Sequence, residues 1–299
     1  MGHGIAQEFA VAGYEVRIHS RTEESLQRGM GRIRDTLQRL TKMGLITRHQ
    51  GRSALPRIQA SAVLGETVDE ADVVIEAVYE DLVLKRRIFG ELDRLCPQRT
   101  ILASTTSTFL PSELASVTRR PGRVLVTHYI NPPYLTPLVE VVRHQSTSDD
   151  TVATVMDLLR EVGKRPVLVQ REVPGFISVR LQFALLREAL SLVQSGVATP
   201  QDVDTVIKNS IGRRWAVAGV FEVLELAGWD LAEAIATSLL PHLENSTQVS
   251  QLLREKVRRQ ELGVKTGKGF YDWTPESGEV LRARIAHAMV EIETWSRTP

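Results

Sequence analysis

The stretch ADVVIEAVYEDLVLKRRIFGELDRLCPQRTILAS, residues 71–104, decides the fold of this 299-residue chain. Residues 72–78 are mostly β-branched and apolar, which predicts a short buried strand. Residues 82–95 show an amphipathic pattern that predicts a helix, and ILAS at 101–104 predicts a second strand. A strand, a helix and another strand in succession indicate a parallel βαβ unit.

The same alternation continues on both sides of this unit. Further strands are predicted at 14–20, 58–61, 124–130, 138–142 and 166–170, and further helical segments at 5–12, about 23–54, 112–117 and 149–162. This pattern predicts an α/β fold with a doubly wound, mostly parallel sheet. After Gly175 the strand signals stop, and apolar residues recur at helical steps. We therefore expect an α/β domain over residues 1–170 and an all-α domain over residues 171–299.

The composition excludes several classes of protein. With 42% hydrophobic and 24% charged residues, the chain is typical of a globular protein. A formal net charge of +1 gives no sign of a nucleic-acid or membrane-surface binder. Cys96 is the only cysteine, and neither a membrane-spanning apolar run nor a secretory signal pattern is present, so we expect a cytoplasmic protein. The seven histidines lack metal-ligand spacing, and no metal is expected.

Two ionisable residues stand on neighbouring predicted strands. His128 lies near the end of one strand and Glu140 inside the next, so that the two side chains can face each other. A carboxylate on one imidazole nitrogen fixes the tautomer and leaves the other nitrogen free to take a proton, as oxidation of an alcohol requires. On spacing alone, a histidine bonded to the backbone and a glutamate on a solvated face are the favoured explanation of the pattern.

The residues around this pair closely resemble the 3-hydroxyacyl-CoA dehydrogenase family. The resemblance rests on motifs in family order along nearly the whole chain: MGHGIAQ (1–7), ADVVIEAVYEDLVLKRRIFGELD (71–93), ILASTTST (101–108), HYINPPYLTPLVEVV (128–142), PGFISVRLQ (174–182) and KTGKGFYDW (265–273). It implies a Rossmann-type NAD(P)-binding domain followed by a helical domain that shapes the substrate cleft and usually forms a homodimer. The NPPY form at 131–134 is nearer to the lambda-crystallin and gulonate dehydrogenase branch.

The resemblance assigns roles to several residues. It implies that His128 is the general base, that Glu140 orients it, and that Ser107 donates a hydrogen bond to the substrate oxygen. Asn131 would contact the nicotinamide side of the cofactor. The alternative is that Asn131 only forms an ordinary Asn-Pro turn.

The resemblance also implies a set of cofactor contacts. Four residues are placed near the cofactor: Ala77 and Val78 end the predicted strand 72–78, and Glu80 and Lys85 follow it, at the sheet edge where open α/β proteins bind ligands. Lys85 is equally explained as an exposed helix residue. The resemblance also implies that Lys265 points toward the dinucleotide. The alternative is that Lys265 simply belongs to a tight glycine turn.

The chain departs from the family pattern at its start. The family's phosphate-binding loop is Gly-x-Gly-x-Met-Gly-x-Gly after a hydrophobic strand, and only Met1, Gly2 and Gly4 of it stand here. We therefore expect a start site assigned too late or a shortened expression product. A chain that truly lacks the first strand would instead bind nucleotide weakly and leave an apolar gap in its sheet.

A second departure concerns the choice of coenzyme. The family usually has Asp after its second strand, where the carboxylate accepts hydrogen bonds from the ribose of NAD. Ser20 and Arg21 stand here, and they can bond to a 2′-phosphate that an acid would repel. NADP is therefore expected to be accepted or preferred, unless Arg21 simply faces water and NAD binds through its other contacts.

Two further observations concern the substrate. Val179 stands where the family has a substrate-binding Asn, so either Ser178 takes this role or Ser107 and His128 act without it. The basic stretch 28–57 contains Thr36, near positions that contact coenzyme A in acyl-CoA members, but a basic helical pair is more often a solvated face.

These observations favour NAD(P)-linked interconversion of a short 3-hydroxyacyl-CoA and its 3-ketoacyl-CoA. A dehydrogenase of a free hydroxy acid such as L-gulonate is the alternative within enzymes. A non-catalytic, crystallin-like binding protein is the alternative outside them.

Overall fold

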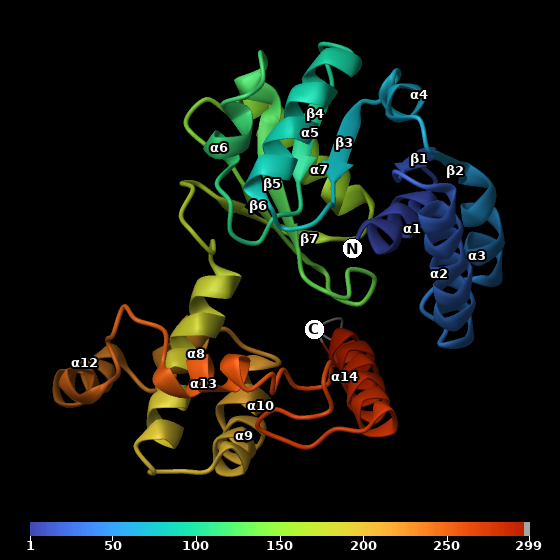
Figure 1. Ribbon diagram of the computed structural model, residues 1–299. Helices are drawn as coiled ribbons and strands as arrows, with labels where there is room; N and C mark the ends of the chain where they lie inside the picture. Colours follow the sequence, from blue (N-terminus) through green and yellow to red (C-terminus); the bar gives the residue numbers. More distant parts are fainter. Residues whose placement is uncertain (296–299) are drawn as a thin grey trace. The chain divides into compact units, whose positions relative to one another are not determined.

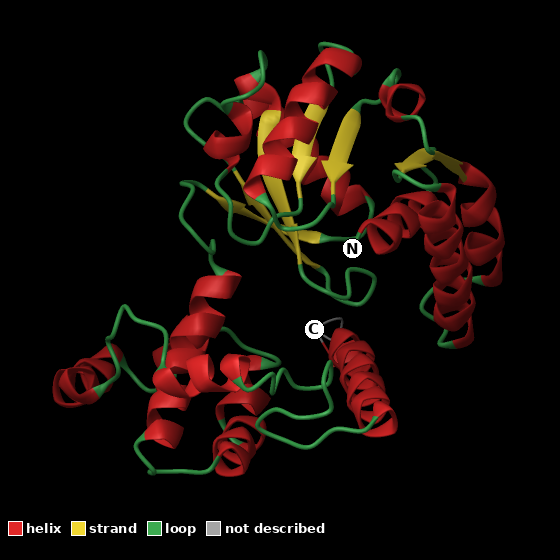
Figure 2. Ribbon diagram, in the orientation of Figure 1, coloured by secondary structure: helices red, strands yellow, loops and turns green. Residues whose placement is uncertain are grey.

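The computed structural model describes residues 1–295 and consists of two compact units, Met1–Arg180 and Leu181–Pro299 (Figure 1). The division falls within helix α8 (Ser178–Gln194). Within residues 1–295, the seven strands all belong to the first unit, and the described part of the second unit is helical apart from its turns (Figure 2).

The first unit alternates strands and helices as the sequence predicts. Its strands are β1 (Val16–His19), β2 (Ile58–Ser61), β3 (Val73–Glu76), β4 (Ile101–Ser104), β5 (Val124–Tyr129), β6 (Leu138–Val142) and β7 (Arg165–Val169). Its helices are α1 (Gly2–Ala12), α2 (Glu23–Lys42), α3 (Arg48–Ala54), α4 (Leu64–Val68), α5 (Leu82–Leu95), α6 (Pro111–Ala115) and α7 (Asp149–Glu161), with short 3₁₀ turns at Leu55–Arg57 and Pro121–Arg123. The predicted α/β fold is thus confirmed, and β2, α5, β4 and β6 have the predicted bounds.

The sheet is mostly parallel and lies in two pieces. β1 pairs with β2, and β3 to β7 form a five-stranded sheet in sequence order, with all pairs parallel except β5 with β6. β1 and β3 each have one edge without a strand partner among residues 1–295. The expected doubly wound sheet is therefore divided where the sequence departs from the family's first strand.

Helix α1 packs against both pieces. Ile5 belongs to the apolar cluster of the five-stranded sheet, with Ile101 and Leu125. Ala6 and Ala10 belong to a second cluster, with residues of α2 and α3. Gly13 ends the helix in the left-handed conformation, which glycine adopts without steric cost.

Side-chain caps fix where the longer helices begin. Thr22, Asp81 and Ser148 accept hydrogen bonds from the first turns of α2, α5 and α7. Asp81 caps α5 directly after the loop that follows β3, so the loop and the helix start are fixed together.

The second unit is formed by most of α8 and by α9 (Pro200–Asn209), α10 (Ile211–Trp215), α11 (Val220–Glu225), α12 (Trp229–Leu239), α13 (Gln251–Arg258) and α14 (Pro275–Trp295), with a 3₁₀ turn at Leu240–His242. No helix within residues 1–295 has both the length and the apolarity to cross a membrane. Leu190 is the only apolar residue of its described part that is buried.

Candidate active site

His128 and Glu140 are direct partners across the antiparallel pair of β5 and β6. Nδ1 of His128 lies 2.6 Å from Oε2 of Glu140, and both side chains are buried. The carboxylate therefore accepts the proton on Nδ1 and leaves Nε2 as the free nitrogen. Nε2 lies 3.2 Å from Oγ of Ser107. The three residues expected to carry the chemistry are thus joined in one chain of hydrogen bonds.

The carboxylate of Glu140 has partners on both oxygens. Oε2 accepts from the Ser178 hydroxyl at 2.6 Å as well as from His128, and Oε1 accepts from the backbone N–H groups of Ile177 and Ser178 at 2.9 Å each. Burial by itself raises the pKa of Glu140, but these hydrogen bonds outweigh burial and lower it to about 2. Glu140 therefore remains an anion at any ordinary pH and stabilises a proton on His128.

The turn before α8 brings these N–H groups to Glu140. Gly175 and Phe176 both have positive φ, 78° and 50°, and a bulky residue rarely adopts this conformation. Phe176 is almost completely buried, and its ring centroid lies 5.5 Å from that of His128. The strained turn thus packs the apolar ring of Phe176 beside the imidazole of His128. It also directs the backbone N–H groups at the start of α8 toward the carboxylate of Glu140.

Glu80 fixes the loop that carries Ser107. One oxygen of Glu80 accepts hydrogen bonds from the Ser107 backbone N–H at 3.0 Å and from the hydroxyls of Thr106 and Thr108. Burial raises the pKa of Glu80, but the hydrogen bonds from Thr106 and Thr108 lower it below its ordinary value. The Glu80 carboxylate thus orients Ser107 rather than standing free in solvent.

Behind this loop lies a buried ion pair. Nζ of Lys85 is 2.9 and 3.1 Å from the two oxygens of Glu76, and each of the two side chains is 1% exposed. Nζ also lies 3.4 Å from Glu80. Glu76 accepts further from the Ser104 hydroxyl and the Val78 backbone N–H, at 2.6 Å each. The pair therefore ties the ends of β3 and β4 to the start of α5.

Sequence reasoning missed Glu76 and Ser104. The signal was a glutamate inside the apolar run at 72–78, because a charge within a buried strand needs a partner of opposite charge. Lys85, nine residues later, is that partner.

Other predicted cofactor residues follow the carboxyl ends of the parallel strands. Ser20 and Arg21 come after β1, Ala77 and Val78 after β3, and Asn131 after β5. In open α/β sheets this edge is where a dinucleotide binds. Arg21, Val78 and Asn131 are exposed there.

The first turn of α1 reaches the same edge. A methyl group added at Gly4 would lie 2.6 Å from the Pro133 ring, and one added at Gly2 would lie 3.6 Å from Ala77. The helix start is therefore packed against the loops after β3 and β5 at distances that require glycine at position 4. A helix N-terminus beside these loops fits an anionic cofactor group.

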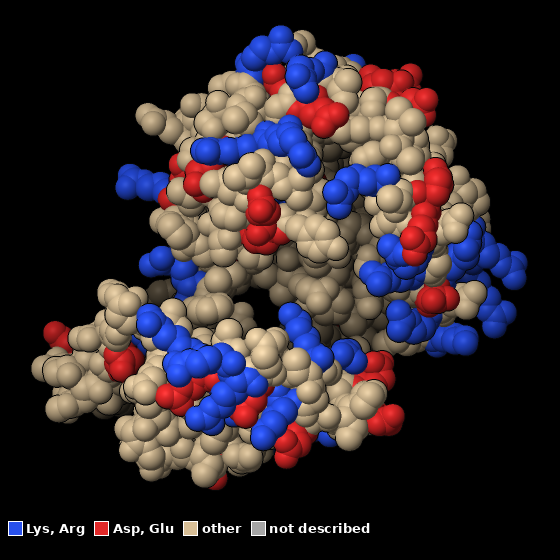
Figure 3. All heavy atoms as spheres, in the orientation of Figure 1, with Lys and Arg blue, Asp and Glu red and all other residues tan. Residues whose placement is uncertain are grey.

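The remaining predicted residues lie elsewhere. Thr36 is 2% exposed on α2, and its hydroxyl accepts from Arg39, so its side chain is not open to a ligand. Arginine and lysine side chains gather over α2 and α3 (Figure 3), which are charged on their exposed face. Lys265 is exposed in a turn of the second unit. Isolated antiparallel β-bridges from Lys268 to Gly263 and to Asp272 hold this turn.

Comparison with known proteins gives consistent results along the whole chain. Residues 1–173 match the family model of the 3-hydroxyacyl-CoA dehydrogenase NAD-binding domain, and residues 175–273 match that of the C-terminal domain. A probable 3-hydroxybutyryl-CoA dehydrogenase of Bacillus subtilis is 38% identical over 91% of this chain and 94% of the relative. The 5-formyl-3-hydroxy-2-methylpyridine 4-carboxylate 5-dehydrogenase of Mesorhizobium japonicum is 33% identical over 98% of this chain and 94% of the relative. A crystal structure of an enzyme of this activity, described as an NAD⁺-dependent dismutase, superposes with a TM-score of 0.93 at 32% identity, covering 100% of this chain and 96% of that one.

Proposed function

Because this chain belongs to the 3-hydroxyacyl-CoA dehydrogenase family, we propose that it interconverts a short 3-hydroxyacyl-CoA and its 3-ketoacyl-CoA. It is an NAD(P)-dependent oxidoreductase that acts on a CH–OH group. The observation that carries the proposal is the hydrogen-bonded chain from Glu140 through His128 to Ser107, at the strand edge that fits a dinucleotide.

The residues of this chain perform the proton transfer. In the direction of oxidation, Nε2 of His128 takes the hydroxyl proton, and Glu140 stabilises the imidazolium that forms. Ser107 lies 3.2 Å from Nε2, so a substrate oxygen within reach of both receives its hydrogen bond. A bound nicotinamide would supply the acceptor for the hydride on the carbon that carries this hydroxyl group. In reduction, His128 returns the proton to the ketone oxygen.

The direct test follows nicotinamide absorbance with acetoacetyl-CoA and each reduced coenzyme. We expect turnover by the wild-type protein and by His49→Ala, a control at an exposed histidine on α3. Absence of turnover with both coenzymes, in a protein whose melting temperature rises with NADH or NADPH, would contradict an acyl-CoA substrate.

A second candidate substrate is a small free carboxylic acid. It is favoured by the TM-score of 0.93 to the pyridine-carboxylate dehydrogenase and by the NPPY sequence at 131–134. The same absorbance measurement with 5-formyl-3-hydroxy-2-methylpyridine 4-carboxylate and with L-gulonate, each supplied with the oxidised coenzymes NAD⁺ and NADP⁺, separates the candidates. A kcat/KM at least tenfold higher for either acid than for the acyl-CoA ester would assign the protein to this second class.

Coenzyme choice gives a testable prediction at Ser20. We propose that Ser20 and Arg21 accept the 2′-phosphate of NADP, since both follow β1 and Arg21 is exposed. Ser20→Asp places a negative charge there and is expected to shift the ratio of kcat/KM values toward NADH by about 10–100-fold. Ser116→Asp, at the exposed end of α6, is the charge-matched control. A wild-type protein that already uses NADH far better than NADPH would refute the role of these residues.

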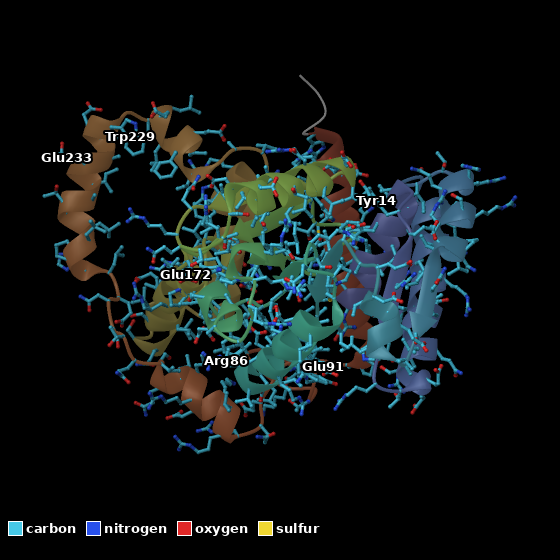
Figure 4. All side chains as sticks on the ribbon, turned by 90° about the horizontal axis from the view of Figure 1, so that it is seen from above. Tyr14, Arg86, Glu91, Glu172, Trp229 and Glu233 are labelled. Atoms are coloured by element: carbon cyan, nitrogen blue, oxygen red, sulfur yellow. The ribbon has the colours of Figure 1, made fainter. Side chains whose placement is uncertain are left out.

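We propose that the helical unit is covered by a second copy of the chain. Only Leu190 of its described apolar residues is buried, which is too little core for an independently stable unit. The segment from α10 to α12, where Figure 4 labels Trp229, exposes a set of large apolar side chains: Trp215, Val217, Val220, Phe221, Leu226 and Trp229. A surface of this kind marks a protein–protein interface.

The homodimer is tested by substitution at this surface. Leu226 is 90% exposed, and Phe221 packs beside Trp229 with ring centroids 6.2 Å apart. We expect Phe221→Asp/Leu226→Arg to convert a species of twice the chain mass to a monomer in light scattering after size exclusion. Val83→Arg, at an 80% exposed site on α5, should leave the mass unchanged. A wild-type protein that is monomeric, with a melting temperature independent of concentration, would exclude the dimer.

A further inference from the structure

We propose that the Ser178 hydroxyl limits how strongly Glu140 holds a proton on His128, and that Ser178 is thereby a positioning residue of the proton transfer. The proposal rests on the proposed function for its catalytic meaning. The effect of Ser178 on the proton of His128 can be measured without a substrate.

The geometry puts two donors on one oxygen. Oε2 of Glu140 accepts from Nδ1 of His128 and from Oγ of Ser178, both at 2.6 Å. Because the negative charge on this oxygen is shared between two short hydrogen bonds, each donor is held less strongly than it would be alone.

The other oxygen cannot take over this role. Oε1 already accepts from the backbone N–H groups of Ile177 and Ser178. These two bonds come from the polypeptide at the start of α8, and substitution of the Ser178 side chain leaves them in place. Removal of the hydroxyl therefore acts on Oε2 alone and returns its charge to His128.

The Ser178 hydroxyl has a single proton to donate. In this structure that proton goes to Glu140, so it is not available to a substrate oxygen at the same time. Val179, which follows, has no donor in its side chain. The role of Ser178 that the geometry supports is thus indirect, through Glu140.

Few charged groups compete with Glu140 for control of His128. Glu140 on β6 contacts it directly, while the turn before α8 offers the apolar ring of Phe176. On the side of Ser107 the charged groups are Glu80, Lys85 and Glu76, and Lys85 pairs with both carboxylates. A change at Ser178 should therefore appear as a change in the titration of His128.

The experiment compares Ser178→Ala with Ser178→Thr, which keeps the hydroxyl. NMR titration of the imidazole, assigned with His128→Gln, is expected to show the pKa of His128 raised by about 0.5–1 unit in Ser178→Ala and restored in Ser178→Thr. The acid limb of kcat/KM for alcohol oxidation should move upward by the same amount, with an unchanged plateau at high pH. Ser195→Ala, beyond the end of α8, is the control.

Each outcome has a definite meaning. An imidazole titration that is unchanged in Ser178→Ala overturns the proposal, as does a loss of rate that is equal at every pH. If the protein turns over none of the substrates tested above, the proposed function fails, yet the NMR titration still decides whether Ser178 controls His128.

Discussion

Replacement of His128 by alanine is expected to lower kcat by about 10²–10⁴-fold, the usual contribution of a positioned general acid–base. The residual rate would come from binding and from the Ser107 hydrogen bond. His128 is buried on the strand β5, between the carboxylate of Glu140 and the ring of Phe176.

The measurement is steady-state kinetics together with coenzyme binding. We expect the dissociation constant of NADH or NADPH to change less than threefold, since His128 acts on the substrate proton. His49→Ala on α3 should retain wild-type kcat. A fall of less than tenfold in kcat of His128→Ala would show that another group accepts the proton and would refute the assigned role.

The strands and the pair His128–Glu140 could be predicted because their signals are local. Short, mostly apolar runs such as ILAS at 101–104 have the length of a fully buried strand. Two residues on consecutive strands meet whenever the register places them opposite each other, as it does here. The family motifs then distinguished this pair from an ordinary buried histidine.

Other features could not be read from the sequence because they depend on the assembled fold. The three hydrogen bonds from the 106–108 loop to Glu80 join segments that are 26–28 residues apart. The second hydrogen bond on Oε2 of Glu140 depends on a turn in which Phe176 adopts positive φ, a conformation that no propensity predicts for phenylalanine. Burial of Lys85 contradicts its usual preference for the surface and is explained by its carboxylate partners, chiefly Glu76.

That buried pair gives the largest expected effect on stability. Lys85→Met removes the ammonium and leaves the carboxylate of Glu76 buried without a counter-ion, which typically costs about 3–5 kcal/mol of the free energy of unfolding. Equilibrium unfolding in urea, followed by a probe of the first unit, measures this loss. Arg87→Met, on the exposed face of the same helix, is the control and should change stability by no more than about 0.5 kcal/mol.

The double variant distinguishes the penalty of an uncompensated charge from the loss of the ion pair itself. In Glu76→Gln/Lys85→Met no charge remains buried, and the glutamine can still bond to the Ser104 hydroxyl and the Val78 N–H. We expect it to recover most of the stability lost in Lys85→Met, because the penalty comes from the orphaned charge rather than from the loss of the pair. A double variant as unstable as Lys85→Met would show that the attraction within the ion pair, and not the penalty of an orphaned charge, accounts for the stability that Lys85 contributes to β3, β4 and α5.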